Sequence, residues 1–577
     1  MRCWFYFFLI GAVAAQTQTG EVTFRDEAPT FQSSVNLVRV PVVVRDKAGH
    51  IVGGLHQSDF HLTDLGKAQE IAQFALEGSA VAKPAERQTM AEIPGEPAAG
   101  AKPVAPTRFV AFVFDDVHLT IADLGNVRVA ALKHIERGIP PQERVGILTL
   151  SGNLSLEFTS DLAKFRETIG KLQPIPARPH FPPASFYAAA QFMRSPGDES
   201  LGCTSAEPGC KVSCDLRMPA VLQTQTDITA DCLHLNCDQI SEAPPIARAT
   251  LRAVYNEGAS EAYNAFHVLN NIVRLLGSMP GDRVMILVSP GLYLPDDLQR
   301  SLSESIDRAT RSGVIINTLD ARGVHTIDPV GEVQSCALTQ SRTQQDIAKL
   351  NHEAITAQGL ILDILAYSTG GTAVSDNDFL GGFNRLANPP DYVYYLGFYP
   401  RDLKPDGKFH EIKVTLASGQ GLSLQARKGY WAPSHVEDAA SAATREIAEA
   451  VFSHDELHDL PLDIDTGFYK TAGADAKLKI TAHLDIRRLH LRKADDRNRN
   501  DVTVVCALFD GNGNYLKGVQ KVVELRLKDE NVEHRRSLGL TMNGDFDVKR
   551  GAYMIRVVAR DAEGRQMAAA NDTVEIP

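Results

Sequence analysis

The densest group of chemically reactive side chains in the 577-residue sequence is a set of cysteines near its middle. In an oxidising compartment six cysteines form three disulfides, with about fifteen pairings that the sequence does not separate. Cys506 stands apart in the apolar run 502–508, which predicts a buried thiol. The candidate disulfide cysteines are Cys203, Cys210, Cys214, Cys232, Cys237 and Cys336.

Zinc binding is the alternative interpretation of these cysteines. Cys210 and Cys214 are separated by three residues, Cys232 and Cys237 by four, and His234 lies between the second pair. Such spacing loosely fits a zinc site. The spacings are irregular, and a cage of thiolates is less expected outside the cytosol, so disulfides are the favoured prediction.

The N-terminus predicts export. Arg2 precedes the apolar run 3–10, and small residues follow up to Ala15. This is the pattern of a secretory signal peptide, predicted here as residues 1–15 and removed after Ala15 together with Cys3. An uncleaved membrane anchor is the alternative, but the apolar run is shorter than the ~20 residues that cross a bilayer. We therefore expect a secreted or periplasmic protein, associated with the cell envelope only peripherally, with no transmembrane segment after cleavage.

Composition limits the partners. The chain is 44% hydrophobic and 23% charged, which is typical of globular domains, and its length predicts several of them. It has 59 Lys and Arg against 71 Asp and Glu, a formal net charge of −12. Without a basic stripe, such a surface repels phosphate backbones, so nucleic acid is excluded as a partner.

Common catalytic motifs are absent from the sequence. There is no Gly-x-Ser-x-Gly elbow, no Gly-x-Gly-x-x-Gly or Walker loop, and no His-Glu-x-x-His. His410, between Phe409 and Glu411, is predicted to be an outward-facing surface residue. These observations argue against an enzyme.

Two acidic segments predict turns. Asp376-Asn377-Asp378 is expected to cap a helix that begins near Phe379. The segment 510–514, Asp-Gly-Asn-Gly-Asn, begins like a calcium loop, but Tyr515 replaces the glycine required at the sixth position. A hairpin turn is the better prediction for it.

The residues 107–391 alternate buried strands with amphipathic helices, which predicts a mostly parallel sheet with helices on both faces. The run Phe109–Phe114 is nearly continuous in apolar residues, as expected for a strand covered on both faces. The alternation is interrupted by a Cys-rich insertion at about 174–258, rich in Pro and Ala. The fold class predicted is therefore α/β.

Smaller β modules are predicted on both sides of this α/β domain. The predicted segments are an N-terminal β module at 35–80, an Ala/Pro-rich linker at 81–106, a β segment at 392–432, a helical linker at 433–460 and a C-terminal β-sandwich at 461–577. The segments 35–80 and 392–432 could pair into one discontinuous module with the α/β domain inserted between them. Aromatic residues at 392–399 are favoured as core, although alternation would also allow an exposed strip.

Several short motifs follow one another in a specific order over roughly 35–432: 42–46, 109–120, 284–292, 319–324, 395–400 and 427–431. In this order of motifs the chain resembles the bacterial von Willebrand factor A (VWA)-related secreted proteins. The resemblance implies a VWA-like, Rossmann-type sheet. It also implies a metal-ion-dependent adhesion site at the carboxyl ends of the strands, where Mg²⁺ or Ca²⁺ is held by an Asp-x-Ser-x-Ser motif and further oxygen ligands.

The implied adhesion site is degenerate in this sequence. Asp116, His118 and Thr120 occupy the motif, with His118 in place of the first serine, and Asp115 could assist. Pro290 stands where the family has an aspartate after its fourth strand. The alternative is that Asp115 and Asp116 cap the following helix and accept hydrogen bonds from backbone N–H groups, without an ion.

The function predicted from the sequence is that of an exported, non-catalytic binding protein of the adhesion type. Its partner would be a protein or the cell-envelope surface, recognised by the VWA-like domain. A divalent cation is the one cofactor considered. The alternatives are a secreted hydrolase with an unrecognised site and a structural component of the envelope.

Overall fold

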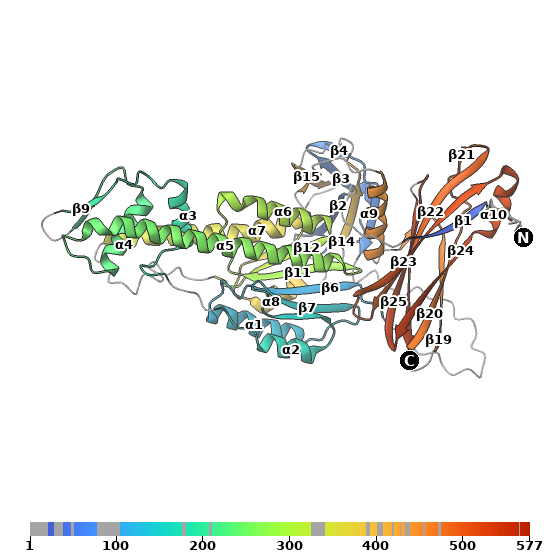
Figure 1. Cartoon of the computed structure of the whole chain (residues 1–577), viewed down its shortest axis with the longest axis horizontal. Helices are drawn as coiled ribbons and strands as arrows, with labels where there is room; N and C mark the ends of the chain where they lie inside the picture. Colours follow the sequence, from blue (N-terminus) through green and yellow to red (C-terminus); the bar gives the residue numbers. More distant parts are fainter. Residues whose placement is uncertain are drawn as a thin grey trace, which may run out of the picture. The chain divides into compact units, whose positions relative to one another are not determined.

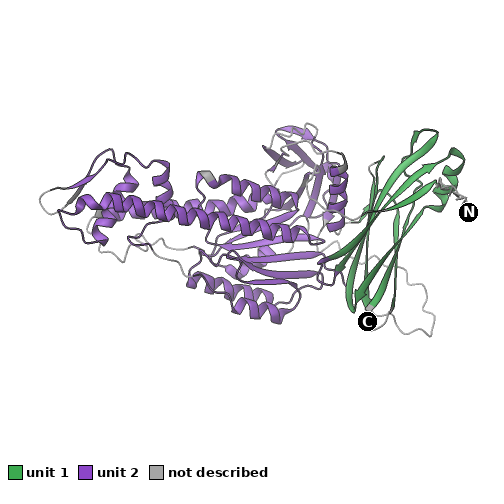
Figure 2. Cartoon of the chain, in the orientation of Figure 1, with its two compact units in different colours: residues 1–31, 455–509, 516–577 green, residues 32–454, 510–515 purple. Residues whose placement is uncertain are grey.

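The computed structural model describes residues 21–27, 38–47, 51–77, 104–175, 180–206, 211–324, 341–387, 393–400, 408–417, 421–426, 429–432, 439–453, 456–470, 475–564 and 566–577. It is a mixed α/β protein of several domains (Figure 1). The predicted signal peptide and nearly all of the predicted linker at 81–106 lie outside the described residues. Two compact units divide the chain (Figure 2): unit 1 comprises 1–31, 455–509 and 516–577, and unit 2 comprises 32–454 and 510–515.

Unit 2 is built around a six-stranded sheet. Its strands are β6 (Arg108–Phe114), β7 (Glu143–Thr149), β8 (Ser155–Thr159), β11 (Asp282–Ser289), β12 (Val314–Asp320) and β13 (Ala373–Val374). The order across the sheet is β13-β12-β11-β6-β7-β8, and all neighbours are parallel except β7 and β8. The chain thus builds one half of the sheet outward from β6 and then returns to build the other half from β11.

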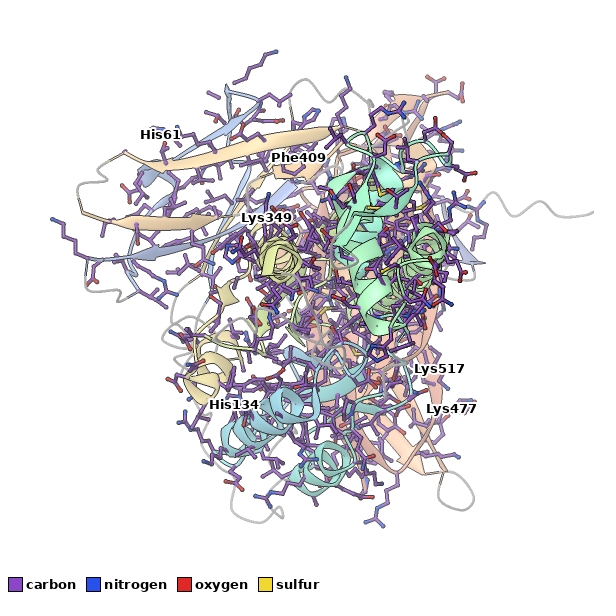
Figure 3. All side chains as sticks on the ribbon, turned by 90° about the vertical axis from the view of Figure 1, so that its left-hand side faces the viewer. His61, His134, Lys349, Phe409, Lys477 and Lys517 are labelled. Atoms are coloured by element: carbon purple, nitrogen blue, oxygen red, sulfur yellow. A yellow bond between two sulfur atoms is a disulfide. The ribbon has the colours of Figure 1, made fainter. Side chains whose placement is uncertain are left out.

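Helices cover both faces of this sheet, which explains why its central strands β6 and β11 are mostly apolar. Phe109, Ala111 and Val113 of β6 point into one core and the residues between them into the other. The first core is closed by the end of α5 (Ala243–Gly277), by α6 (Gln299–Arg311) and by the end of α7 (Ser341–Thr369). The second is closed by α1 (Ile121–Ile135), α2 (Leu162–Gly170) and α8 (Phe379–Ala387). In Figure 3, His134 marks α1, where it lies 2.8 Å from Asn384 of α8.

The predicted Cys-rich insertion forms a helical arm. Its elements are α3 (Phe186–Arg194), β9 (Cys203–Ala206), β10 (Lys211–Cys214) and α4 (Ala220–Cys232), packed on the first half of α5 around a core of their own. In Figure 1 the arm extends past the sheet along α5. Thr343 of α7 donates a hydrogen bond to Asp227 of α4 at 3.1 Å, so α7 supports the arm as well.

The two short β segments of the sequence form one module with a shared core. One sheet has the order β16 (Ser423–Ala426), β2 (Val38–Arg45), β14 (Val393–Phe398) and β5 (Gln73–Glu77). The other has the order β17 (Gly429–Trp431), β15 (Phe409–Leu416), β3 (Phe60–Asp64) and β4 (Lys67–Gln69), with His61 and Phe409 labelled in Figure 3. Strands on either side of the α/β domain in sequence are therefore neighbours in both sheets. Tyr394 and Phe398 are buried in the shared core, whereas Tyr399 is exposed.

One expectation for this module is wrong. His410 of β15 was predicted to face outward, but only 4% of it is exposed. Its Nδ1 lies 3.2 Å from the hydroxyl of Tyr430, which donates to Asp64 at 2.7 Å. Polar partners on two other strands allow this histidine to be buried.

The predicted helical linker contains α9 (Ala439–Phe452), whose Ile447 and Val451 are buried. The carbonyl oxygen of Phe452 accepts hydrogen bonds from the backbone N–H of Gly281, at 3.2 Å, and from the guanidinium of Arg283. The helix is therefore packed into unit 2 next to the start of β11.

Unit 1 is a pair of sheets around one core. One sheet has the order β1 (Val22–Glu27), β23 (Tyr515–Leu527), β22 (Arg497–Asp510), β25 (Gly551–Asp561), β26 (Met567–Ile576) and β18 (Leu457–His458), with β21 (Arg492–Ala494) on β22. The other has the order β19 (Leu462–Lys470), β20 (Asp475–Leu484) and β24 (Leu540–Lys549), and α10 (Val532–Leu538) precedes β24. The edge strand β1 was not predicted; it pairs antiparallel with β23 from the opposite end of the sequence.

Among the residues that the structure describes, no helix combines the length and the apolar character needed to cross a membrane.

Candidate functional site

Polar side chains gather where the parallel strands of the central sheet end. Because β6, β7, β11 and β12 run in the same direction, the residues that follow them meet at one edge. We call this edge the strand-end rim. It consists of Asp115, Asp116, His118, Ser151, Ser289 and Asp320.

Asp115 is the centre of the rim and is fully buried. Its Oδ1 accepts hydrogen bonds from the backbone N–H of His118 at 3.0 Å and from the Nδ1 of the same residue at 2.9 Å. The hydroxyl of Ser289, at the end of β11, donates to Oδ2 at 2.7 Å. Both carboxylate oxygens are therefore occupied by protein donors.

Asp115 and His118 each shift the pKa of the other. Burial alone would raise the pKa of Asp115, but the charge of His118 and hydrogen bonds from His118 and Ser289 lower it below its usual value. Burial alone would lower the pKa of His118, but Asp115, and then Glu261 and Asp116, raise it. The side chain of His118 remains 26% exposed, so its imidazole ring is accessible at the rim.

Asp116 is bound to the neighbouring strand. Its Oδ1 accepts the backbone N–H of Ser151 at 3.0 Å, and its Oδ2 accepts the hydroxyl of the same residue at 2.6 Å. Ser151 lies two residues after the end of β7. This carboxylate ties two strand ends together.

Thr120 begins α1 as its N-cap. Its hydroxyl accepts the backbone N–H of Asp123 at 3.1 Å and lies 2.8 Å from the Asp123 carboxylate. The helix is thus capped by Thr120, and the two preceding aspartates, which the sequence offered as caps, bind other groups.

The three residues predicted to form a degenerate adhesion site contact three different partners. Asp116 contacts Ser151, His118 contacts Asp115, and Thr120 contacts Asp123. Within the described residues no three His, Cys, Asp or Glu side chains are grouped so that they could hold a metal ion. The residues present therefore do not fit a divalent ion held by the family motif, because an ion would have to displace Ser151 from Asp116.

Sequence reasoning did not assign Ser151 and Ser289 to this site. Each follows or ends a buried strand, and that is the signal that could have identified them, because carboxyl ends of parallel strands share one edge. Asp320, at the end of β12, belongs to the same edge and forms a bidentate ion pair with Arg322. The Nη2 of Arg322 lies 2.7 Å from Oδ2 and its Nε 3.0 Å from Oδ1. Arg322 also donates to Gln358 of α7 at 3.1 Å, which fixes the β12 end against that helix.

The loop after β11 is held by a close backbone approach. Gly291 has a φ of +90°, and a Cβ at this position would lie 2.4 Å from the carbonyl oxygen of Gln358. Glycine is therefore required here. The loop places Tyr293 against Tyr187 of α3, with ring centroids 5.0 Å apart.

The helical arm starts at the rim itself. The backbone N–H of Ile175, at the beginning of the insertion, donates to the carbonyl of Asp116 at 2.7 Å. His180 lies 2.5 Å from Glu257 of α5, one helical turn from Glu261, which acts on His118. The rim is therefore bordered by the base of the arm.

The serines of the rim are not arranged as nucleophiles. Both hydroxyls donate to carboxylates, Ser151 to Asp116 and Ser289 to Asp115, and the Nδ1 of His118 also faces Asp115. A catalytic triad instead needs a histidine that takes the proton of the serine, with the aspartate behind the histidine. The observed hydrogen bonds from these side chains to Asp115 and Asp116 instead hold the strand ends in place.

The cysteine cluster forms disulfides. Cys203 and Cys214 are bonded and join β9 to β10, while Cys232 and Cys237 are also disulfide-bonded. These bonds contradict the zinc alternative, because Cys214, Cys232 and Cys237 have no free thiolate. Cys210 and Cys336 lie outside the described residues. Cys506 is a buried free thiol, as predicted, and burial raises its pKa to about 12.

The two acidic turns are as predicted. Asp378 accepts the backbone N–H of Gly381 at 2.8 Å and so caps α8. Asp510 accepts the backbone N–H groups of Asn512 and Asn514, both at 2.9 Å, and the side chain of Asn514. The segment is a hairpin turn between β22 and β23 whose carboxylate is saturated by its own loop.

Comparisons with known proteins give no family. No family model matches the chain, and no curated protein matches it. Bacteroides uniformis β-glucuronidase 2 aligns with 33% of this chain at 11% identity and a TM-score of 0.13, and only 19% of that enzyme, about a fifth of its length, is spanned. Three N-terminal domains of the type V pili tip protein Mfa5 from Porphyromonas gingivalis align over 88% of this chain and 77% of theirs, at 8% identity and a TM-score of 0.19. These scores are too low to support a shared fold or function.

Proposed function

We propose that this protein is an exported, non-catalytic binding protein that uses a VWA-like domain to engage a protein or cell-envelope surface at its strand-end rim. The observation that carries the proposal is the position of Asp115 and Ser289. They follow and end β6 and β11, the two adjacent strands between which the chain reverses its direction of sheet building. In open α/β sheets, ligands bind outside the carboxyl ends of the strands at this switch point.

Binding rather than catalysis is supported by the use of the rim's polar groups. Asp115 and Asp116 fix strand ends, and the hydroxyls that could attack a substrate donate to them. Among the residues that the structure describes, the rim offers a partner the exposed part of His118 and two exposed apolar side chains. These are Ile121, at 81% exposure, and Val324, at 71%. An apolar contact beside a charged group is a common composition for a protein interface.

The proposed interface works through protein groups and not through an ion in the family motif. Asp116 uses both oxygens on Ser151, and Thr120 caps α1. Mg²⁺ or Ca²⁺ is therefore expected to leave the hydrogen exchange of residues 115–124 unchanged, both in the natural chain and in Asp116→Ala. An ion-dependent protection that Asp116→Ala abolishes would restore the adhesion-site interpretation.

Export is supported by the disulfide chemistry of the arm. Disulfides persist in oxidising compartments and are rare in the cytosol. Cys203–Cys214 and the disulfide-bonded Cys232 and Cys237 fit an exported chain, as does the signal-like N-terminus.

Site-specific photo-crosslinking tests the rim as the binding surface. A photoreactive amino acid replaces Ile121 or Val324 at the rim, or, as matched exposed controls at the opposite edge, Val104 before β6 or Leu275 at the end of α5. Each variant is produced and irradiated in its own cells. We expect one discrete adduct from the two rim positions and none from the controls. Equal adducts from all four positions, or none from any, would refute the rim as the binding surface.

A further inference from the structure

The β module of unit 2 contains a pocket of about 890 Å³, and the core of this module is separate from the two cores of the central sheet. We call it the module pocket; His61, labelled in Figure 3, is one of its lining residues. β4 pairs only with the second half of β3, and the chain then crosses at 70–72 to β5 in the other sheet. Residues of both sheets line the pocket, so it lies where the edges of the two sheets part. Its size is that of a site for a small molecule.

The floor of the module pocket is apolar and aromatic. It contains Phe60, Leu62 and Ile71, which are 4, 2 and 9% exposed, and the half-buried Phe74. The rings of Phe60 and Phe74 have centroids 5.9 Å apart. Behind them lies Tyr394, with its ring centroid 5.1 Å from that of Phe60 and 6.1 Å from that of Phe74. The pocket therefore opens onto a cluster of three rings in the core of the module.

The mouth of the module pocket is polar but carries no acid and no strong base. His56, Ser58 and His61 are exposed there, and among all the lining residues there is no Asp, Glu, Lys or Arg. The neighbouring Asp59 accepts the backbone N–H of His56 at 2.7 Å. An ionised ligand would leave water for an apolar floor without an opposite charge to pair with. The lining therefore favours an uncharged ligand.

The walls of the module pocket are held by hydrogen bonds within the protein. The 3-10 turn η1 (Gln57–Asp59) forms one wall, and the side-chain amide of Gln57 donates to the carbonyl of Ile71 at 2.8 Å, across the pocket's edge. The hydroxyl of Tyr394 accepts the backbone N–H of Leu55 at 3.1 Å and donates to the carbonyl of Val52 at 2.9 Å. These bonds fix the segment before η1 on the ring cluster. A ligand would therefore find the pocket formed and would have few groups to order.

We propose that the module pocket binds a small uncharged aromatic molecule. Its ring would contact Phe60 and Phe74, because aromatic rings attract each other in edge-to-face and offset arrangements in addition to burying apolar area. A hydroxyl or N–H group of the ligand would face the polar mouth. This site is independent of the strand-end rim, since none of the residues that line it belongs to the rim.

Methyl NMR of the full chain, titrated with indole or p-cresol, tests the proposal. Leu62 and Ile71 line the pocket, so their methyl signals should shift with a dissociation constant of about 1 mM or less, as expected for molecules of this size. The methyl signals of Ile286 and Leu287, in β11 of the central sheet, should not move. Benzoate and benzylammonium have a similar ring but carry a charge, and they should bind at least about tenfold more weakly.

A pair of alanine variants on the edge strands of the module provides the matched control. Ala68 of β4 is exposed and lines the pocket, so Ala68→Trp should place an indole ring there and weaken the binding of both probes about tenfold or more. Ala75 of β5 is also exposed but does not line the pocket, and Ala75→Trp should bind the probes as the natural chain does. The methyl signals of Ile412, buried in the same core, show that the module is folded in both variants.

Four results would overturn the proposal. Two are the absence of any shift at Leu62 and Ile71 with either probe at about 10 mM, and equal affinity for the charged analogues. The third is undiminished binding in Ala68→Trp. The fourth is tighter binding of N-acetyl-tryptophanamide than of indole, which would assign the pocket to an aromatic side chain of a polypeptide. Failure of the rim crosslinking would leave this site untouched, because the two experiments read different residues.

Discussion

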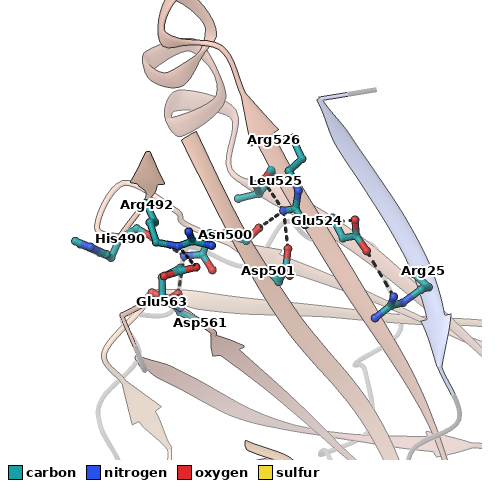
Figure 4. A network of polar contacts seen from close by, with 10 residues as sticks. All are labelled: Arg25, His490, Arg492, Asn500, Asp501, Glu524, Leu525, Arg526, Asp561 and Glu563. Carbon is teal, nitrogen blue, oxygen red and sulfur yellow. Dashed lines mark hydrogen bonds and ion pairs between the residues drawn. The ribbon is translucent and has the colours of Figure 1, made fainter. Parts of the chain in front are cut away.

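Asp115 of the rim and Asp561 of unit 1 are both fully buried aspartates at the end of a central strand, yet they differ in how their oxygens are used. Asp115 accepts donors on both oxygens, including the charged His118 and Ser289. Asp561 accepts three donors on one oxygen and none on the other. Burial of an acid therefore does not mark a ligand site. The distribution of donors around the acid, drawn for Asp561 in Figure 4, shows how firmly the fold holds each of its two oxygens.

Replacing a buried aspartate by asparagine should lower the free energy of unfolding most at Asp115 of the rim. Asp115→Asn removes the negative charge that pairs with His118. It also replaces one carboxylate oxygen by an amide N–H₂, so that either Ser289 or His118 loses its hydrogen-bond acceptor. We expect the free energy of unfolding of unit 2 to fall by about 3 kcal/mol. Urea unfolding followed by hydrogen exchange of unit 2 measures it. Asp123→Asn, in the first turn of α1 and near the surface, should cost less than about 1 kcal/mol. Equal losses in both variants would contradict the structural role of Asp115.

The rim should also respond to pH, and the sign follows from the two pKa shifts. The pKa of His118 is raised, so its contribution is complete below the ordinary histidine value of ~6.5 and disappears as pH rises through the raised pKa. The pKa of Asp115 is lowered, so its contribution disappears only as pH falls below the ordinary range of a carboxyl group. Stabilisation from the pair is therefore greatest in mildly acidic solution.

We accordingly expect unit 2 to lose about 1 kcal/mol of unfolding free energy as pH rises from mildly acidic to alkaline, beyond the change in His118→Gln. Urea titrations of both chains across this range measure the difference. His134→Gln is the control. Burial lowers the pKa of His134, so this histidine loses its charge at a lower pH than His118 does. The variant should therefore keep the loss of stability that His118 causes as pH rises. Parallel profiles of the natural chain and His118→Gln would contradict the ion pair.

Local sequence pattern predicted the elements well. The apolar run Phe109–Phe114 is β6 almost residue for residue, because a strand covered on both faces must be apolar throughout. The caps and turns at Asp378 and Asp510 were predictable for a similar reason, since each aspartate accepts hydrogen bonds from residues two to four positions away. Interactions confined to a few neighbouring residues leave a signature that one sequence contains.

Partners that are distant in the sequence were not predictable in this way. His410 is buried because Tyr430 and Asp64 reach it from other strands, and β1 is a strand because β23 offers it an edge. At the rim, Ser151 binds both oxygens of Asp116, which the family motif would give to an ion. The sequence pattern of Asp116, His118 and Thr120 indicates which groups could bind an ion, but the fold determines which protein donors form hydrogen bonds with them.

The smallest predicted effect completes the comparison between the two aspartates. Asp561→Asn should change the unfolding free energy of unit 1 by less than about 1 kcal/mol, or raise it, because the new amide N–H₂ supplies a donor to acceptors that have none. The nearby oxygens of Asn500 and Gln566 are such acceptors. Urea unfolding measures this, with Asp115→Asn as the opposite case. A loss as large as that of Asp115→Asn would mean that Oδ2 of Asp561 already has a partner in the folded chain, and the contrast between the two aspartates would disappear.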